Sequence, residues 1–284
     1  MRGEGTSIPR VISCGITQAG SRKTVNEDSF QCVGRIYPDT LDSREEKISN
    51  CEDFWQIYSV CDGLGGAGIG DIAGRVIQGA ICELRRGFPL LDPMNFDFAR
   101  YIQAFVDQAD AALRGRLSRF ARLPVGCSLA LIMFAGDTAY TMSIGNCRCY
   151  LYRQQKLYVM TRDLRLNEDR DERPLLFFGN HPGSQHLRAH NLTEMTVQAG
   201  DQFLIVSDGF TRAMEAQDIQ HVMERPSRWA DLVANLFQSA RRYDASKDQT
   251  ILGLHVESRR VFADPFESND DEDIKIWPGR AKHR

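Results

Sequence analysis

The chain has 284 residues, and its hydrophobic content of 42% is enough to build a substantial core. A formal net charge of −3 gives no bulk attraction to nucleic acid or to an anionic membrane. No signal-peptide core and no apolar run of about 18 residues is visible, so we expect a cytoplasmic protein without membrane insertion. The eight cysteines include no Cys-x-x-Cys pair, which favours buried free thiols over a zinc site.

The first half of the chain alternates short apolar runs with two amphipathic segments. In these segments the apolar residues recur at i, i+3 and i+4, the pattern of a helix with one buried face. Asn95 and Asp97 are the two N-cap candidates of the second helix. We predict strands at 10–19, 28–36 and 54–61, an exposed charged loop at 38–53, and helices at 69–86 and 96–121.

The apolar period changes after residue 127. Short runs separated by turn residues such as Ala135-Gly136-Asp137 predict an antiparallel meander. The polar loop at 162–190 is unusually long for a compact domain, and such loops are usually functional. The expected elements are strands at 127–134, 138–144, 148–152, 157–160, 202–207 and 250–256, and helices at 216–224 and 227–242.

Two apolar runs far apart in the sequence end in the same dipeptide. One ends at Asp62-Gly63 and the other at Asp208-Gly209, while Glu27 and Asp248 lie just before other predicted strands. These positions predict carboxylates that meet at one point, where they repel one another unless a cation neutralises them. An all-oxygen cluster of this kind suits Mg²⁺ or Mn²⁺, and the Gly63 carbonyl can add a further oxygen ligand.

A basic pair precedes the first of these acids. Arg22 or Lys23 would hold phosphate oxygens, the arginine in a bidentate way and the lysine as a point charge. Two divalent ions can activate a bridging water and neutralise a phosphate during in-line attack. The pattern therefore indicates a metal-dependent enzyme acting on phosphate, although Asp-Gly turns at strand ends also occur without any metal.

The glycines after Asp62 support a rival interpretation. The segment from Gly63 to Gly68 fits a G-x-G-x-x-G pattern between a strand and a helix, as in dinucleotide-binding proteins. Glu83 is the candidate ribose-binding acid, but it falls inside the predicted helix and not at the end of a second strand. This interpretation also leaves Asp208 and Asp248 without a role, so it is the weaker one.

The chain contains seven short motifs in a fixed order. They are Asn26-Glu27-Asp28, Asp62-Gly63-Leu-Gly65-Gly66, Gly126-Cys-Ser128, Gly145-Asn-Cys-Arg148, Thr161-Arg-Asp163, Ser207-Asp208-Gly209 and Asp248-Gln-Thr250. Each motif is weak alone, but the match to the ordered set spans about residues 12 to 256. Taken together, the motifs resemble the metal-dependent protein Ser/Thr phosphatases of type 2C, and bacterial members in particular.

The resemblance implies an α+β fold, a four-layer α-β-β-α sandwich of two antiparallel sheets with helices on both outer faces. It implies hydrolysis of phosphoserine and phosphothreonine by direct attack of a metal-bridging water. The substrate would be a phosphorylated protein, the target of a Ser/Thr kinase, which implies a role in signal transduction. Residues 1–257 would form the phosphatase domain and residues 258–284 a loosely attached tail.

The resemblance also assigns roles by position. Asp62 would bridge two Mn²⁺ or Mg²⁺ ions. Asp208 and Asp248 would complete the shell of one ion, and Glu27 with the Gly63 carbonyl would support the other. These positions are intact in this chain, which favours an active enzyme.

Other positions depart from the family pattern. Asn146 stands where the family has an Asp associated with a third, weaker ion, and its uncharged amide disfavours that ion. Leu64 replaces a histidine proposed as general acid, a loss that matters most for a poor leaving group. Lys23, with Arg22 beside it, occupies the place of the phosphate-binding arginine, and Arg212 stands where an Asp is frequent. A catalytically weak, phosphatase-like regulatory protein is therefore the alternative function.

Overall fold

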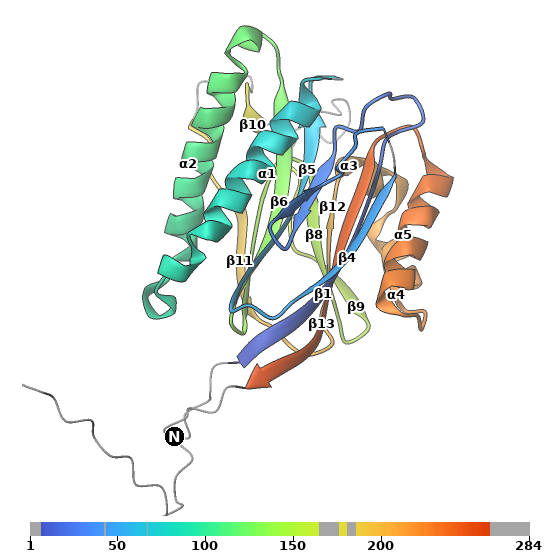
Figure 1. Ribbon diagram of the computed structural model, residues 1–284. Helices are drawn as coiled ribbons and strands as arrows, with labels where there is room; N and C mark the ends of the chain where they lie inside the picture. Colours follow the sequence, from blue (N-terminus) through green and yellow to red (C-terminus); the bar gives the residue numbers. More distant parts are fainter. Residues whose placement is uncertain (1–6, 43, 67, 165–175, 181–185, 262–284) are drawn as a thin grey trace, which may run out of the picture.

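The structure is a computed structural model that describes residues 7–42, 44–66, 68–164, 176–180 and 186–261. Two antiparallel sheets pack face to face, and helices cover both outer faces (Figure 1). The first sheet has the strand order β4 (Glu45–Cys51), β1 (Ser7–Gln18), β13 (Gln249–Val261), β12 (Gln202–Val206), β8 (Arg148–Arg153) and β9 (Lys156–Val159). The second has the order β11 (His190–Thr196), β7 (Thr138–Ile144), β6 (Gly126–Ala135), β5 (Trp55–Leu64), β2 (Ser29–Cys32) and β3 (Arg35–Tyr37), and β10 (Phe178–Gly179) also pairs with β6.

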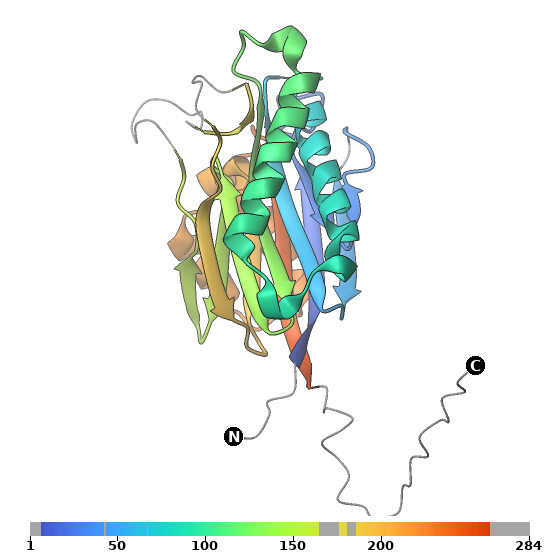
Figure 2. The same cartoon turned by 90° about the vertical axis from the view of Figure 1, so that its left-hand side faces the viewer.

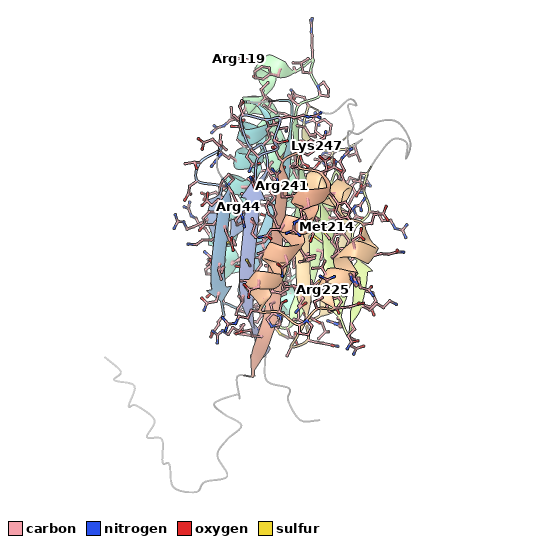
Figure 3. The ribbon with its side chains drawn as sticks, turned by 90° about the vertical axis from the view of Figure 1, so that its right-hand side faces the viewer. Arg44, Arg119, Met214, Arg225, Arg241 and Lys247 are labelled. Atoms are coloured by element: carbon pink, nitrogen blue, oxygen red, sulfur yellow. The ribbon has the colours of Figure 1, made fainter. Side chains whose placement is uncertain are left out.

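The helices divide between the two outer faces. Helices α1 (Gly70–Arg86) and α2 (Phe98–Arg116) lie over the second sheet, as Figure 2 shows. Helices α3 (Asp208–Ala213), α4 (Ala216–Met223) and α5 (Trp229–Tyr243) lie over the first sheet, where α4 and α5 face the viewer in Figure 3. The expected four-layer α+β sandwich is confirmed.

Strand β6 shows how the sequence builds three layers of core. Its residues are almost all buried, so it appears in the sequence as a continuous apolar run. Cys127, Leu129 and Leu131 point into the core under α1 and α2, while Ala130 and Ile132 point into the core between the sheets. This alternation follows from the two-residue period of a strand. A third core lies between the first sheet and α3, α4 and α5.

The helix predictions hold in their main features. Ala73, Ile77 and Ile81 of α1 are fully buried in the stripe that the i, i+3, i+4 spacing predicts. At the start of α2, the carboxylate of Asp97 accepts a hydrogen bond from Arg100 N at 3.0 Å, so Asp97 is the N-cap. The eight cysteines, all within the described ranges, are free, and six of them are buried.

The meander prediction was wrong at its centre. Strands β6 and β7 form a hairpin in the second sheet, but β8 and β9 form a hairpin in the first. The segment from Gly145 to Cys147 carries the chain from one sheet to the other. Gly145 has a φ of +97°, and a Cβ there would lie 2.2 Å from Ser128 Oγ. Only glycine allows this crossing so close to β6.

The charged segment 38–53, predicted as a loop, contains the edge strand β4. This strand pairs with β1 from Thr17–Glu45 to Val11–Cys51, and its residues alternate between exposed and half-buried. Edge strands commonly carry charged residues, which disguises them in the sequence. Strand β11 and helix α3 were also missed.

The long loop and the end of the chain complete the comparison. Within 162–190, the described residues include β10 and the first residue of β11, whereas 165–175 and 181–185 lie outside the described residues. Strand β13 runs to Val261, beyond the expected domain boundary at 257. The rest of the predicted tail, 262–284, lies outside the described residues.

Candidate active site

A cavity of about 210 Å³ lies where β5 and β12 end and where β2 and β13 begin. Its wall brings together residues that are up to 225 positions apart, since Lys23 Nζ donates to Asp248 Oδ2. Every predicted metal ligand lines this cavity. The lining residues are Lys23, Glu27, Asp62, Gly63, Leu64, Gly65, Asn146, Asp208, Gly209, Arg212, Lys247 and Asp248.

One half of the cavity is built from Glu27, Asp248 and Lys23. The Lys23 ammonium donates to Glu27 Oε2 at 2.5 Å and to Asp248 Oδ2 at 2.8 Å. Asp248 also accepts from Gly20 N at 2.8 Å and from Glu27 N at 3.0 Å. Burial lowers the pKa of Lys23, but the hydrogen bonds to Asp248 and Glu27 outweigh it, so the net shift is upward. Lys23 is therefore a charged counterion in this half.

Glycines allow the backbone to close around Glu27. Gly63 N donates to the Glu27 carbonyl at 3.2 Å. A Cβ at Gly63 would lie 2.4 Å from the Gly70 carbonyl, and a Cβ at Gly70 would lie 2.3 Å from Glu27 Oε1. That oxygen is buried and has no hydrogen-bond partner among the described residues. A buried carboxylate oxygen without a partner is costly, and a cation would satisfy it.

The other half contains Asp62 and Asp208. Asp208 N donates to Asp62 Oδ2 at 3.1 Å, which joins the end of β5 to the start of α3. Burial and then the charges of Asp208 and Asp248 raise the pKa of Asp62 to about 7, while Lys23 opposes the rise. Burial, Asp62 and Asp248 also raise the pKa of the neighbouring Asp28. This half therefore has an excess of negative charge.

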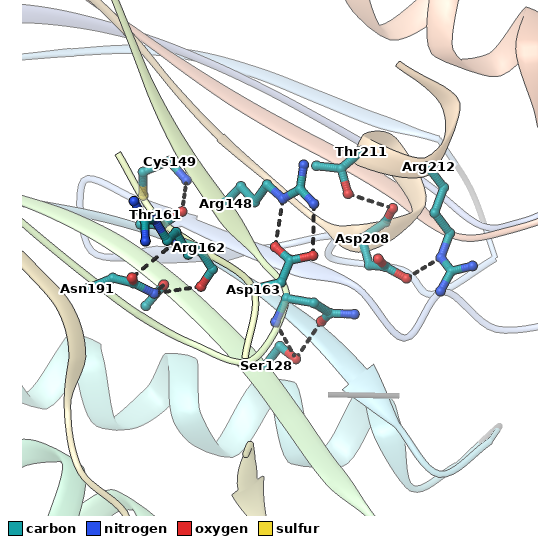
Figure 4. A network of polar contacts seen from close by, with 12 residues as sticks. Ser128, Arg148, Cys149, Thr161, Arg162, Asp163, Asn191, Asp208, Thr211 and Arg212 are labelled. Atoms are coloured by element: carbon teal, nitrogen blue, oxygen red, sulfur yellow. Dashed lines mark hydrogen bonds and ion pairs between the residues drawn. The ribbon is translucent and has the colours of Figure 1, made fainter. Parts of the chain in front are cut away.

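Arg212 and Asn146 occupy the wall beside Asp208. Arg212, one helical turn after Asp208, donates from Nε to Asp208 Oδ2 at 2.5 Å (Figure 4). The Asn146 side chain accepts a hydrogen bond from Ser128 Oγ at 2.8 Å. Asn146, Asp208 and Arg212 line the cavity, and Ser128 supports this wall through its hydrogen bond to Asn146.

Arg148 and Asp163 connect two further motifs. Arg148 Nε and Nη2 donate to the two Asp163 oxygens at 2.6 and 2.8 Å (Figure 4). Cys149 N donates to Thr161 Oγ1 at 2.9 Å, and Leu164 N donates to the Gly145 carbonyl at 3.0 Å. Planar bidentate pairs of this kind fix orientation as well as distance. They hold the beginning of the 162–190 segment against β8.

Two basic residues differ from the sequence expectation. Arg22 is exposed and does not line the cavity, although its charge makes a small contribution to the lowered pKa of Asp244, which Ser246 mainly determines. Lys247 lines the cavity and was missed. Its position directly before Asp248 was the available signal.

The donor set fits a divalent cation in chemical type. It offers clustered carboxylates, the backbone of Gly63 and the partnerless Glu27 Oε1. Within the part of the chain that the structure describes, no three His, Cys, Asp or Glu side chains form a ready metal cage. Lys23 and Arg212 instead pair with three of the acids.

The dinucleotide interpretation fails on topology. Every strand pair in the described ranges is antiparallel, so the glycines after Asp62 do not open a parallel βαβ unit. Glu83 lies inside α1, away from this cavity.

Solved structures share this architecture. The catalytic domain of the serine/threonine phosphatase PstP in complex with two manganese ions superposes with a TM-score of 0.67 at 21% identity, covering 88% of this chain and all of that one. Stp1 from Staphylococcus aureus gives 0.71 at 15% identity, covering 87% of this chain and 95% of that one. PppA from Pseudomonas aeruginosa gives 0.67 at 21%, covering 88% and 99%. These similarities establish the fold.

The family follows from the sequence. Residues 26–173 match the family Protein phosphatase 2C, and the chain belongs to this family. PstP from Mycobacterium tuberculosis strain H37Rv is 23% identical over 235 residues, which cover 76% of this chain and 45% of PstP. The chain thus spans about half the length of the curated relatives it matches.

Proposed function

We propose that this chain is a hydrolase that removes phosphate from phosphoserine and phosphothreonine with the help of Mn²⁺ or Mg²⁺. The observation that carries the proposal is the gathering of Glu27, Asp62, Asp208 and Asp248 around one cavity. Mutual repulsion and burial make such a cluster costly without added positive charge. Four retained acids in the family's motif order are what a divalent-metal site requires.

The residues would divide between two ions. By family resemblance, Asp62 would be shared by both ions, Asp208 and Asp248 would hold one of them, and Glu27 with the Gly63 carbonyl would hold the other. When bound, the ions supply a nucleophilic water at neutral pH and charge that neutralises the phosphate. The uncharged Asn146, already held by Ser128, disfavours a third ion.

The chain's own residues contribute position and charge. Backbone N–H groups and Lys23 fix the carboxylate of Asp248, and Asp208 N fixes that of Asp62. Leu64 lines the cavity but has no proton to give. The leaving serine or threonine oxygen must then take its proton from water or from another group, which slows poor leaving groups.

A catalytically weak regulatory protein is the second candidate. The ion pairs of Lys23 and Arg212 favour it, because both cations occupy carboxylate oxygens that a metal would use. Such a protein would keep the fold and bind a phosphorylated partner without efficient turnover.

The wider setting is also a proposal. The substrate would be a phosphoprotein, the target of a Ser/Thr kinase, in the cytoplasm and in signal transduction, with no nucleic-acid partner and no membrane insertion. Across the described residues, no helix combines the length and apolar character needed to span a bilayer. We further propose residues 1–257 as the core of the phosphatase domain and 258–284 as a C-terminal extension, although β13 continues to Val261.

The first test is phosphate release from a phosphothreonine peptide by the purified chain, with Mn²⁺ and with EDTA. We expect release that requires Mn²⁺. Mn²⁺ binding by calorimetry without any release would reject the enzyme and support the regulatory protein. Neither binding nor release would reject both.

A further inference from the structure

Among the residues that the structure describes, three basic side chains line the candidate active site: Lys23, Arg212 and Lys247. Lys23 is committed to the acids, because its ammonium donates to Glu27 at 2.5 Å and to Asp248 at 2.8 Å. Two of the three N–H donors of a lysine are used in this way. Lys23 therefore serves first as the counterion of these carboxylates.

Arg212 has a different geometry. Its Nε is anchored on Asp208 (Figure 4), and its side chain is 23% exposed. A guanidinium carries five N–H donors in a planar fork and can bind more than one anion. The bond to Asp208 orients the group at the wall of the cavity.

The backbone that carries Arg212 is tightly held. A Cβ at Gly209 would lie 1.9 Å from the Asp248 carbonyl and 3.0 Å from Lys247 Cβ, so the first turn of α3 packs directly against the loop before β13. Phe210, in the same turn, is fully buried. This contact places the segment that carries Lys247 beside the helix that carries Arg212.

We propose that Arg212 binds the phosphate group of the substrate, with Lys247 as a second, weaker cation. The inference rests on the proposed function, because it names the group that a phosphorylated side chain would meet. Arg212 would donate N–H bonds to two phosphate oxygens and form no covalent bond. Its charge offsets the repulsion between the phosphate and the acids of the site. The alternative, Arg22, lies outside the cavity wall.

The test is the dissociation constant of inorganic phosphate, measured by calorimetry on the full chain with Mg²⁺ present. We expect Arg212→Gln to weaken phosphate binding by about 10-fold or more, the usual value of charged hydrogen bonds. Arg212→Lys keeps the charge but loses the planar fork, so its phosphate affinity should fall between those of the wild type and Arg212→Gln. The matched control, Arg225→Gln, changes an exposed arginine far from Lys247 in Figure 3 and should bind phosphate normally.

Each outcome separates this inference from the enzyme proposal. Thermal unfolding verifies that each variant folds. If Arg212→Gln does not fold, the phosphate affinity of Arg212→Lys decides the role of Arg212. Normal phosphate binding by the Arg212 variants, or a loss in Arg22→Gln instead, overturns the role of Arg212 even if the wild type hydrolyses phosphopeptides. Arg212-dependent phosphate binding without hydrolysis supports the inference and rejects the enzyme. Absence of phosphate binding in the wild type overturns the inference, while Mn²⁺-dependent phosphate release from the peptide decides the enzyme proposal separately.

Discussion

The two halves of the candidate active site neutralise their acids in different ways. In the Glu27–Asp248 half, one lysine bridges both carboxylates, and two backbone N–H groups also donate to Asp248. In the Asp62–Asp208 half, Arg212 pairs with Asp208, while Asp62 receives one backbone N–H and has a raised pKa.

This difference indicates where an ion would stabilise the protein most. The first half is largely satisfied by the chain itself, apart from Glu27 Oε1. The second half concentrates buried negative charge on Asp62. Burial and the charges of both Asp208 and Asp248 raise its pKa. An external cation therefore gains more at Asp62 than at Asp248.

The largest expected effect comes from Asp208→Asn, which removes a ligand charge from the second half without changing its size. We expect Mn²⁺-dependent hydrolysis to fall about 1,000-fold, a loss of about 4 kcal/mol of transition-state stabilisation. Steady-state kinetics on a phosphothreonine peptide measure it. Asp231→Asn, at an exposed position of α5, is the matched control. Retained activity in Asp208→Asn would remove Asp208 from the metal site.

The next effect concerns the leaving group. Because Leu64 cannot donate a proton, hydrolysis of an aryl phosphate should exceed that of a phosphothreonine peptide by about 100-fold in kcat/KM. Leu64→His should narrow this ratio by improving the peptide reaction. A wild-type enzyme that prefers the peptide would show that another group acts as the acid.

Lys23→Gln tests whether the first half is stabilised by its own counterion. The change leaves the carboxylates of Glu27 and Asp248 without their ammonium partner. Since the Lys23 side chain is 34% exposed, we expect a modest loss of about 1–2 kcal/mol in metal-free unfolding free energy. Urea unfolding in EDTA measures this loss. Mn²⁺ should then raise the unfolding free energy more in the variant than in the wild type. An equal rise in both proteins would show that Lys23 does not neutralise the carboxylates that bind the metal.

Asp62→Asn tests the excess charge of the second half through pH. The pKa of Asp62 is about 7 in the folded state and near its ordinary value of 3.8 in the unfolded state. The folded state therefore holds the Asp62 proton more tightly than the unfolded state does. The contribution of this proton to the free energy of unfolding is complete below about pH 4 and is lost as the pH rises through 7.

In EDTA, we expect the loss of the Asp62 proton to lower the free energy of unfolding of the wild type. Between pH 5 and pH 8 the drop should exceed that of Asp62→Asn by on the order of 1 kcal/mol or more. The variant should be the more stable protein at pH 8 and yet inactive with Mn²⁺. Urea unfolding at both pH values decides the matter. Parallel pH profiles for the two proteins would contradict the charge imbalance.

The smallest effect is expected from Asn146→Asp, which adds a carboxylate beside Asp208. If a third ion then binds, hydrolysis at high Mn²⁺ should rise about 2- to 5-fold, a change below about 1 kcal/mol in the barrier. The measurement is activity as a function of Mn²⁺ concentration. A flat response would make Asn146 a framework residue, fixed by its bond to Ser128.

The sequence by itself determined most of the helices and strands and the acids of the candidate site. The apolar spacing in α1 and the Asp97 cap are local properties, so they were predictable from neighbouring residues. The motif order likewise indicated that Asp62 and Asp208 would meet. Strand-end Asp-Gly pairs were the visible signal, because a Cβ at Gly63 or Gly209 would lie within 3 Å of other backbone atoms, so these positions need glycine.

Only the tertiary structure decided how the strands are shared between the sheets and where the cations lie. Strands β7 and β8 have similar patterns, yet the crossing at Gly145 sends them to different sheets, and charge conceals the edge strand β4. The pairing of Lys23 with Asp248 joins residues 225 positions apart. No local rule encodes such contacts, because they arise from long-range packing. The same packing brought Arg212 and Lys247 to the cavity and left Arg22 outside it.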